Sequence, residues 1–320
     1  MDEAAIIERF FRHLGAVRTD VVLGIGDDAA LLRPAPGFDL ALTTDSLVEN
    51  VHFLPGSAPQ SLGHRALAVN LSDLAAMGAK PCWALLSLAL PSIDESWLGE
   101  FATGLGRLAR QHDVALVGGN LSRGPLNITL QLAGFVPANT ALRRSGARAG
   151  DEVWVSGTLG DAACGRLGAG AAADASSAWL RQRFEYPTPR VAVGDALRGF
   201  ATACIDLSDG LLADLPRLAA ASGCGAVLEV DRLPLSDALV AAPRALAGAD
   251  PWQAALLGGE DYELCFTAPP AAAQALADIG TRSAVALTRC GVLRAGAGLE
   301  LRRGGDVIQF SQSPFGHFPA

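Results

Sequence analysis

The sequence predicts an α+β protein built from two domains. Its 320 residues exceed the usual size of a domain with a single core, so two domains of about 150 residues are the default expectation. Half of the residues are hydrophobic, which supplies apolar side chains for sizeable cores. Helical and extended patterns mix irregularly along both halves, and this favours mixed sheets over one regular parallel sheet.

The first half opens with an amphipathic helix over residues 3–14, whose apolar side chains recur on one helical stripe. Residues 126–132 alternate apolar and polar side chains, the period of a strand with one wet face. The other elements expected in this half are strands at 21–23, 38–44, 83–90 and 114–117 and helices at 61–78 and 94–112.

Between Pro137 and Asp151 the pattern breaks into Asn, Thr, Gly and Arg residues, as is typical of a linker. We therefore divide the chain into an N-terminal domain, 1–138, and a C-terminal α/β domain, 139–320. The elements expected in the second half are strands at 151–156, 203–205, 226–230 and 262–267 and helices at 160–168, 190–199, 210–221, 236–247 and 271–279.

The composition excludes several classes of partner. The formal net charge is -8, whereas a phosphate backbone requires a basic surface, so we expect no nucleic acid. No apolar run approaches the about 18 residues of a membrane helix, and the acidic start lacks the features of a signal peptide. The six cysteines form no Cys-x-x-Cys pair, which favours buried, reduced thiols. We expect a cytoplasmic protein without a membrane partner.

Five short segments place oxygen-bearing side chains at expected strand ends or helix starts. They are Gly26-Asp27-Asp28, Thr43-Thr44-Asp45, Leu71-Ser72-Asp73, Asp206-Leu207-Ser208-Asp209-Gly210 and Gly258-Gly259-Glu260-Asp261. Carboxylates that converge on one cleft repel one another unless cations are present, and magnesium held by carboxylates usually accompanies substrate phosphates. Asp and Ser are also the ordinary N-caps of helices, so each segment by itself is equally compatible with capping.

Known nucleotide motifs are absent or incomplete. The only lysine, Lys80, follows Ala79, so the chain has no Walker A loop. The spacing Gly24-x-Gly26-x-x-Ala29 fits a loose dinucleotide motif and leaves an oxidoreductase open, although the two Asp residues inside it would repel a pyrophosphate. Arg143 and Arg144 are as compatible with a phosphate clamp as with a solvated loop. A lone His52 is more often structural than functional.

Taken together, the motifs resemble the thiamine-monophosphate kinase family nearly from end to end. The segments that carry the resemblance are Gly24 to Leu31, Thr43 to Val48, Asn70 to Ala79, Ile205 to Leu211 and Gly258 to Leu264. ATP-dependent synthetases that make aminoimidazole ribonucleotide and selenophosphate share the fold of this family.

The resemblance implies a homodimer whose N-terminal sheets pair into a barrel, with ATP in the cleft between the two domains of each subunit. It implies direct in-line transfer of the γ-phosphoryl group of ATP to thiamine monophosphate, with several Mg²⁺ ions. Thiamine diphosphate and ADP are the products. No covalent enzyme intermediate is expected, so no protein side chain is assigned as catalytic.

The resemblance also implies roles for individual residues. The expected magnesium ligands are Asp28, Thr43, Thr44, Asp45, Asp73, Asn120, Asp206 and Asp209. The expected ATP contacts are Gly119, Asn120, Arg144 and Ser208. The expected contacts to thiamine monophosphate are His52, Glu260 and Phe315.

One position departs from the family pattern. Where the family typically reads Gly-Gly-Asp-Thr-Thr-Arg, this chain has Gly118-Gly119-Asn120-Leu121-Ser122-Arg123, so a carboxylate becomes a neutral amide. We expect this change to weaken one magnesium site. Two alternatives stay open beside the kinase: another ATP-dependent synthetase of the same fold, and a non-catalytic nucleotide-binding protein.

Overall fold

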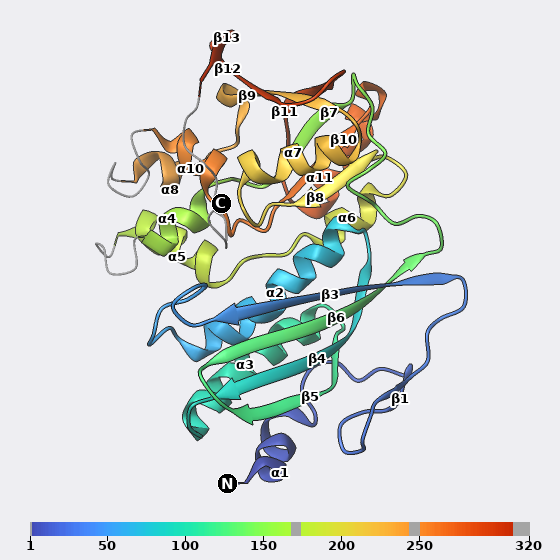
Figure 1. Ribbon diagram of the computed structural model, residues 1–320, viewed down its shortest axis with the longest axis vertical. Helices are drawn as coiled ribbons and strands as arrows, with labels where there is room; N and C mark the ends of the chain where they lie inside the picture. Colours follow the sequence, from blue (N-terminus) through green and yellow to red (C-terminus); the bar gives the residue numbers. More distant parts are fainter. Residues whose placement is uncertain (1, 168–173, 243–249, 310–320) are drawn as a thin grey trace. The chain divides into compact units, whose positions relative to one another are not determined.

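The computed structural model describes residues 2–167, 174–242 and 250–309 (Figure 1). The chain divides into two compact units. Unit 1 comprises Met1–Leu74 and Ala79–Asn139, and unit 2 comprises Ala75–Gly78 and Thr140–Ala320. Each unit combines helices with a mixed sheet, so the α+β prediction is confirmed.

The sheet of unit 1 has the strand order β3-β6-β4-β5, which makes β3 and β5 its two edges. These strands are β3 (Phe38–Val48), β6 (Asn127–Pro137), β4 (Lys80–Leu90) and β5 (Ala115–Arg123). The pairs β3/β6 and β4/β6 are antiparallel, and β4/β5 is parallel. A parallel pair needs a crossover connection, which helix α3 (Glu95–Gln111) provides.

Helices α2 (Pro59–Ala76) and α3 cover one face of this sheet (Figure 1). Helix α3 begins at Asp94, whose carboxylate accepts the backbone N–H groups of Ser96 and Trp97. Its residues Leu98, Phe101 and Leu105 recur at helical spacing and are fully buried. Helix α3 packs closely on α2, since a Cβ at Gly63 of α2 would lie 2.1 Å from the carbonyl oxygen of Phe101.

The N-terminal segment contacts helix α3 through η1 and then continues onto the opposite face of the sheet. It contains α1 (Glu3–Ile6), a π-helix η1 (Ile7–Phe11), β1 (Val21–Leu23) and β2 (Leu31–Leu32). The helical segment is shorter than the helix predicted over 3–14, because α1 and η1 end at Phe11. Gly15, further along, has a φ of +93°, and a Cβ there would lie 2.3 Å from the carbonyl oxygen of Val114. Val21, Ala30 and Leu32 pack against the buried end of the sheet.

The sheet of unit 2 has the strand order β13-β12-β9-β11-β7-β10-β8. Its strands are β7 (Glu152–Ser156), β8 (Ala203–Asp206), β9 (Gly225–Glu229), β10 (Leu264–Ala268), β11 (Leu287–Arg294), β12 (Leu299–Arg303) and β13 (Asp306–Ile308). Every pairing except β12/β9 is antiparallel. This unit is therefore α+β and not the α/β domain that we expected, because its helices do not cross over between successive parallel strands.

Helices and short 3₁₀ turns complete unit 2. They are α4 (Asp161–Leu167), α5 (Ala175–Glu185), α6 (Val191–Leu197), α7 (Leu211–Ala221), η2 (Val230–Arg232), α8 (Asp237–Ala241), α10 (Pro251–Leu257), η3 (Pro270–Ala272) and α11 (Ala273–Ser283). Helix α8 is shorter than the predicted helix 236–247, whose end lies partly outside the described residues. Among the described helices, none is both long and apolar enough to cross a bilayer.

Candidate functional site

Strand β3 and helix α2 bring two expected magnesium ligands into contact. The hydroxyl of Thr43 donates a hydrogen bond to Oδ2 of Asp73. Asp45 is two residues beyond Thr43, so it projects from the same face of β3. Thr43, Asp45 and Asp73 therefore belong to the side of the sheet that α2 covers.

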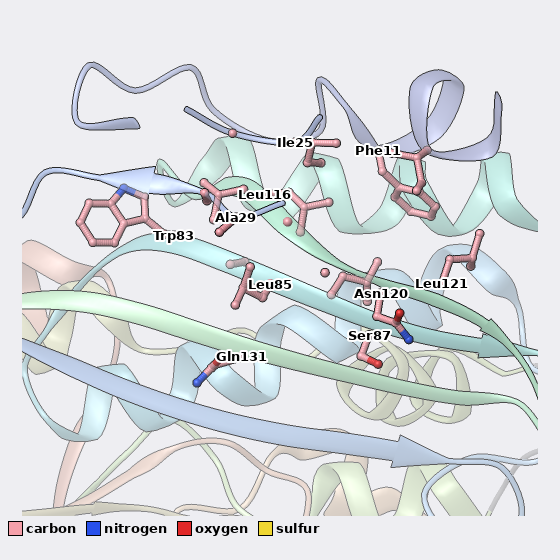
Figure 2. Close-up of a pocket in the computed structure, with 18 of the residues that line it drawn as sticks. Phe11, Ile25, Ala29, Trp83, Leu85, Ser87, Leu116, Asn120, Leu121 and Gln131 are labelled. Carbon is pink, nitrogen blue, oxygen red and sulfur yellow. The ribbon is translucent and has the colours of Figure 1, made fainter. Parts of the chain in front are cut away.

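The opposite face of the same sheet borders a cavity of about 1120 Å³. Its lining includes Asp28, Thr44, Gly119 and Asn120 from the expected site, together with apolar side chains of the N-terminal segment. Figure 2 shows Ser87 and Asn120 next to each other on the sheet, with Phe11 and Ile25 on the other side of the cavity. The hydroxyl of Thr44 donates to the backbone carbonyl of Leu130 at 3.1 Å.

The position of Asn120 depends on the glycine before it. Gly119 has a φ of +150°, and a Cβ placed there would lie 1.8 Å from the carbonyl oxygen of Leu86 on the neighbouring strand. Only glycine therefore allows β5 to approach β4 this closely. The register that results places Asn120 opposite Ser87.

Two parts of the expected metal site are separated within one chain. Asp45 lies on edge strand β3 and Asn120 on edge strand β5, with β6 and β4 between them. Neighbouring strands are about 4.8 Å apart, so three spacings amount to about 14 Å. Ligands of one magnesium ion lie about 2.1 Å from the metal, so these two residues of one protomer cannot share an ion.

His52 is held in a tight turn directly after β3. Its backbone N–H donates to the carbonyl of Val48, and its carbonyl accepts Nη1 of the buried Arg65 at 2.7 Å. The Nδ1 atom of His52 accepts the backbone N–H of Val48 at 3.1 Å. A ring nitrogen that accepts a hydrogen bond carries no proton, so the neutral imidazole has its proton on Nε2.

In unit 2 the acidic loop between β8 and α7 carries three expected site residues. Asp206 ends β8, and Ser208 and Asp209 follow it, half-buried. Arg217 donates from Nη1 to Oδ2 of Asp209 at 2.6 Å and to Oδ1 of Asp214 at 2.7 Å. Burial raises the pKa of Asp214 to about 6, against the opposing effect of the Asp209 backbone N–H that it accepts.

The segment that contains Glu260 is hydrogen-bonded to this acidic loop. The N–H of Glu260 donates to the carbonyl of Ser208 at 2.9 Å, and the N–H of Tyr262 donates to the carbonyl of Leu207 at 3.0 Å. The N–H of Leu207 in turn donates to the carbonyl of Glu263 at 2.8 Å. One expected ATP contact, Ser208, and one expected substrate contact, Glu260, are thus brought together by backbone pairing.

The buried hydrogen-bond network of Glu263 behind this segment was missed by sequence reasoning. Glu263 is fully buried and accepts hydrogen bonds from Ser156 Oγ (2.6 Å), Arg183 Nη2 (2.8 Å) and Arg190 Nε (2.6 Å). Asp261 is also buried and accepts the backbone N–H of Gly160 at 2.8 Å. Burial raises the pKa of Asp261 well above its usual value. The only sequence signal was that a third acidic residue, Glu263, follows two residues after the Gly258-Gly259-Glu260-Asp261 motif.

The remaining expected residues are placed as follows. Arg144 is exposed, and its backbone carbonyl accepts the hydroxyl of Ser222 at 3.0 Å. Phe315 lies outside the described residues. Within the part of the chain that the structure describes, no three His, Cys, Asp or Glu side chains are grouped to hold a metal ion. The donors at the expected magnesium positions are carboxylate, hydroxyl and amide oxygens, which is the ligand chemistry that magnesium prefers.

Comparison with protein families identifies two consecutive matches. Residues 26–136 match the family described as "AIR synthase related protein, N-terminal domain", and residues 148–304 match its C-terminal domain. The chain is 46% identical to the thiamine-monophosphate kinase of Salmonella typhimurium, over 99% of this chain and 98% of that protein. It is 38% identical to the corresponding kinase of Caulobacter vibrioides, over 90% and 83% of the two chains.

Solved structures give the same result. A crystal structure of thiamine-monophosphate kinase from Stenotrophomonas maltophilia superposes with a TM-score of 0.84 at 46% identity, covering 91% of this chain and 93% of that one. A structure named "AaThiL complexed with AMPPCP and TMP" superposes with a TM-score of 0.77 at 35% identity, covering 92% of each chain. Similarity therefore extends over both units of the chain.

Proposed function

The chain belongs to the thiamine-monophosphate kinase family, and from that premise we propose that it transfers the γ-phosphoryl group of ATP to the phosphate of thiamine monophosphate. The products are thiamine diphosphate and ADP. The observation that carries this proposal is the backbone pairing between Ser208 and Glu260, which brings an expected nucleotide contact next to an expected substrate contact in one unit. The relative whose structure contains AMPPCP and TMP supports the same two ligands here.

The side chains of the site serve mainly to bind and align. Gly119, Asn120, Arg144 and Ser208 contact ATP, while His52 and Glu260, together with Phe315 beyond the described residues, contact thiamine monophosphate. The Nε2–H of His52 is a donor suited to a phosphate oxygen. The acceptor is itself a phosphate anion, so in-line transfer requires no general base.

The expected magnesium ligands fit a hard cation because they are oxygen donors. We assign the magnesium ions to Asp28, Thr43, Thr44, Asp45, Asp73, Asp206 and Asp209, with Asn120 as a neutral ligand. Bound magnesium would neutralise charge on the crowded phosphates and keep the attacking and leaving oxygens aligned. The contact between Thr43 and Asp73 supports the assignment because it already directs two of these oxygens at each other.

A homodimer would bring together the two edge strands that carry Asp45 and Asn120. Within the described residues, edge strand β3 is paired on one side only, and β5 is paired on its outer side only at its start, where Ala115 forms a bridge with Gly15. Pairing β3 of one copy with β5 of another would close the two sheets into a barrel and place the strand that carries Asp45 beside the strand that carries Asn120 of the other copy. The exposed side chains of Phe38, Leu40 and Leu42 on β3 support this arrangement, because a barrel would bury apolar surface.

A cytoplasmic location is part of the proposal. All six cysteines are buried free thiols, which suits a reducing compartment. Burial raises the pKa of the Cys82 thiol to about 12 and that of the Cys164 thiol to about 11, so neither is reactive at neutral pH.

The test is a product assay. Purified protein incubated with ATP, Mg²⁺ and thiamine monophosphate should yield thiamine diphosphate, separated and quantified by chromatography. Binding of ATP without any product would favour the non-catalytic nucleotide-binding alternative. ATP consumption that never requires thiamine monophosphate would favour another synthetase of the same fold.

A further inference from the structure

The segment from Glu260 to Glu263 has an unusual backbone. Glu260 has a φ of +71° and Tyr262 a φ of +50°, so two non-glycine residues in three occupy the left-handed region. Side chains with a Cβ avoid this region unless the surroundings enforce it. The structure must therefore contain contacts that hold the segment in place.

Asp261, between these two residues, and Glu263, after them, supply those contacts. Asp261 accepts the backbone N–H groups at the start of α4, and Glu263 accepts the side chains of Ser156, Arg183 and Arg190. Glu263 is fully buried and Asp261 is only 3% exposed. A buried carboxylate with charged partners is costly to displace, so this side of the segment is rigid.

The other two residues of the segment, Glu260 and Tyr262, form a hydrogen bond with each other. The hydroxyl of Tyr262 donates to Oε2 of Glu260 at 2.8 Å. Tyr262 is only 8% exposed, so its hydroxyl has few alternatives to this acceptor. A hydrogen bond to a charged acceptor is stronger than one between neutral groups.

We propose that Tyr262 is a positioning residue for substrate recognition: its hydroxyl fixes the direction of the Glu260 carboxylate toward the cationic, amine-bearing part of thiamine monophosphate. The inference rests on the proposed function, because it gives Glu260 a thiamine monophosphate contact. A carboxylate held by a phenol on one oxygen binds a cation or an amine without first losing rotamer freedom. Asp261 and Glu263 are hydrogen-bonded to other parts of unit 2, and these contacts hold the segment that carries Glu260 and Tyr262 in place.

The test removes one atom. Tyr262→Phe keeps the ring and deletes the hydroxyl, and we expect the KM for thiamine monophosphate to rise about tenfold, the value of a hydrogen bond to a charged group. The KM for ATP and the Tm should change little. Tyr186→Phe, at the chain's only other tyrosine, is the matched control and should leave both KM values unchanged.

A double-mutant cycle separates positioning from packing. In a Glu260→Ala background there is no carboxylate to direct, so adding Tyr262→Phe should weaken thiamine monophosphate binding by less than about twofold further. The affinity is measured by calorimetric titration without ATP, which does not depend on turnover. Additive effects of the two changes, or an unchanged affinity in Tyr262→Phe alone, would overturn the inference.

The same titration distinguishes this inference from the proposed function. If the wild type binds thiamine monophosphate but forms no thiamine diphosphate, the kinase proposal fails while a non-additive cycle still supports positioning by Tyr262. If the wild type neither binds nor phosphorylates thiamine monophosphate, both proposals are contradicted.

Discussion

Asp45 and Asn120 lie on the two opposite edge strands of one four-stranded sheet, with β6 and β4 between them. Both are expected magnesium ligands, and neither can reach the other's ion within one protomer. Variants can therefore test whether one active site takes residues from two chains.

Mixed dimers test whether the site is completed by a second copy. We expect Asp45→Asn and Asn120→Ala each to lose most activity as homodimers. When the two variants are unfolded together and refolded, half of the dimers should be mixed and each should contain one intact site, which gives about a quarter of wild-type activity. If each site is built within one chain, mixing restores nothing.

The amide of Asn120 predicts a raised magnesium requirement. Asn120→Asp adds one negative charge, whose attraction to a divalent cation is worth about 2 kcal/mol at 4 Å in water-like surroundings, so the half-saturating Mg²⁺ concentration should fall on the order of thirtyfold. The measurement is initial rate against Mg²⁺ concentration at saturating substrates. The same magnesium dependence in both proteins would show that Asn120 contacts no metal.

The close approach at Gly119 predicts a severe effect of a single methyl group. Gly119→Ala would place Cβ 1.8 Å from the carbonyl oxygen of Leu86 and should destabilise unit 1 by at least about 3 kcal/mol. Gly118→Ala is the control, because its Cβ would meet only the end of the Leu85 side chain at 3.0 Å. Urea unfolding of both variants measures the difference, and equal stability would contradict the strand geometry described for β5.

The lowered pKa of His112 predicts that the protein loses stability in mild acid. Its pKa is lowered from 6.5, first by burial and then by nearby His64, so the folded protein binds a proton less readily than the unfolded chain. The free energy of unfolding should therefore be highest above pH 6.5 and fall as the pH drops toward 5. His112→Gln should reduce this slope in Tm measurements between pH 7 and 5; an unchanged slope would exclude His112 as its source.

The elements that the sequence predicted well are those with strong local patterns. Helix α3 was expected at 94–112 and spans Glu95–Gln111, because its cap and its apolar spacing are both local signals. Helix α5 was missed because its polar residues obscure any apolar stripe. Strands β11, β12 and β13 were missed as well, since their burial depends on partners distant in the sequence.

The candidate site was predicted unevenly for a similar reason. Short motifs located Thr43, Asp73, Ser208 and Glu260, and the contacts between Thr43 and Asp73 and between Ser208 and Glu260 followed only from the structure. No local pattern could show that Arg190 binds Glu263, because 73 residues separate them. Strand order likewise decides that Asp45 and Asn120 are apart.

The fate of the γ-phosphoryl group tests the central claim most directly. With ATP labelled at the γ-phosphorus, Mg²⁺ and thiamine monophosphate, we predict that the label appears in thiamine diphosphate in a one-to-one ratio with ADP. Label that appears only in inorganic phosphate, or that is released equally without thiamine monophosphate, would contradict the assignment of this chain as a thiamine-monophosphate kinase.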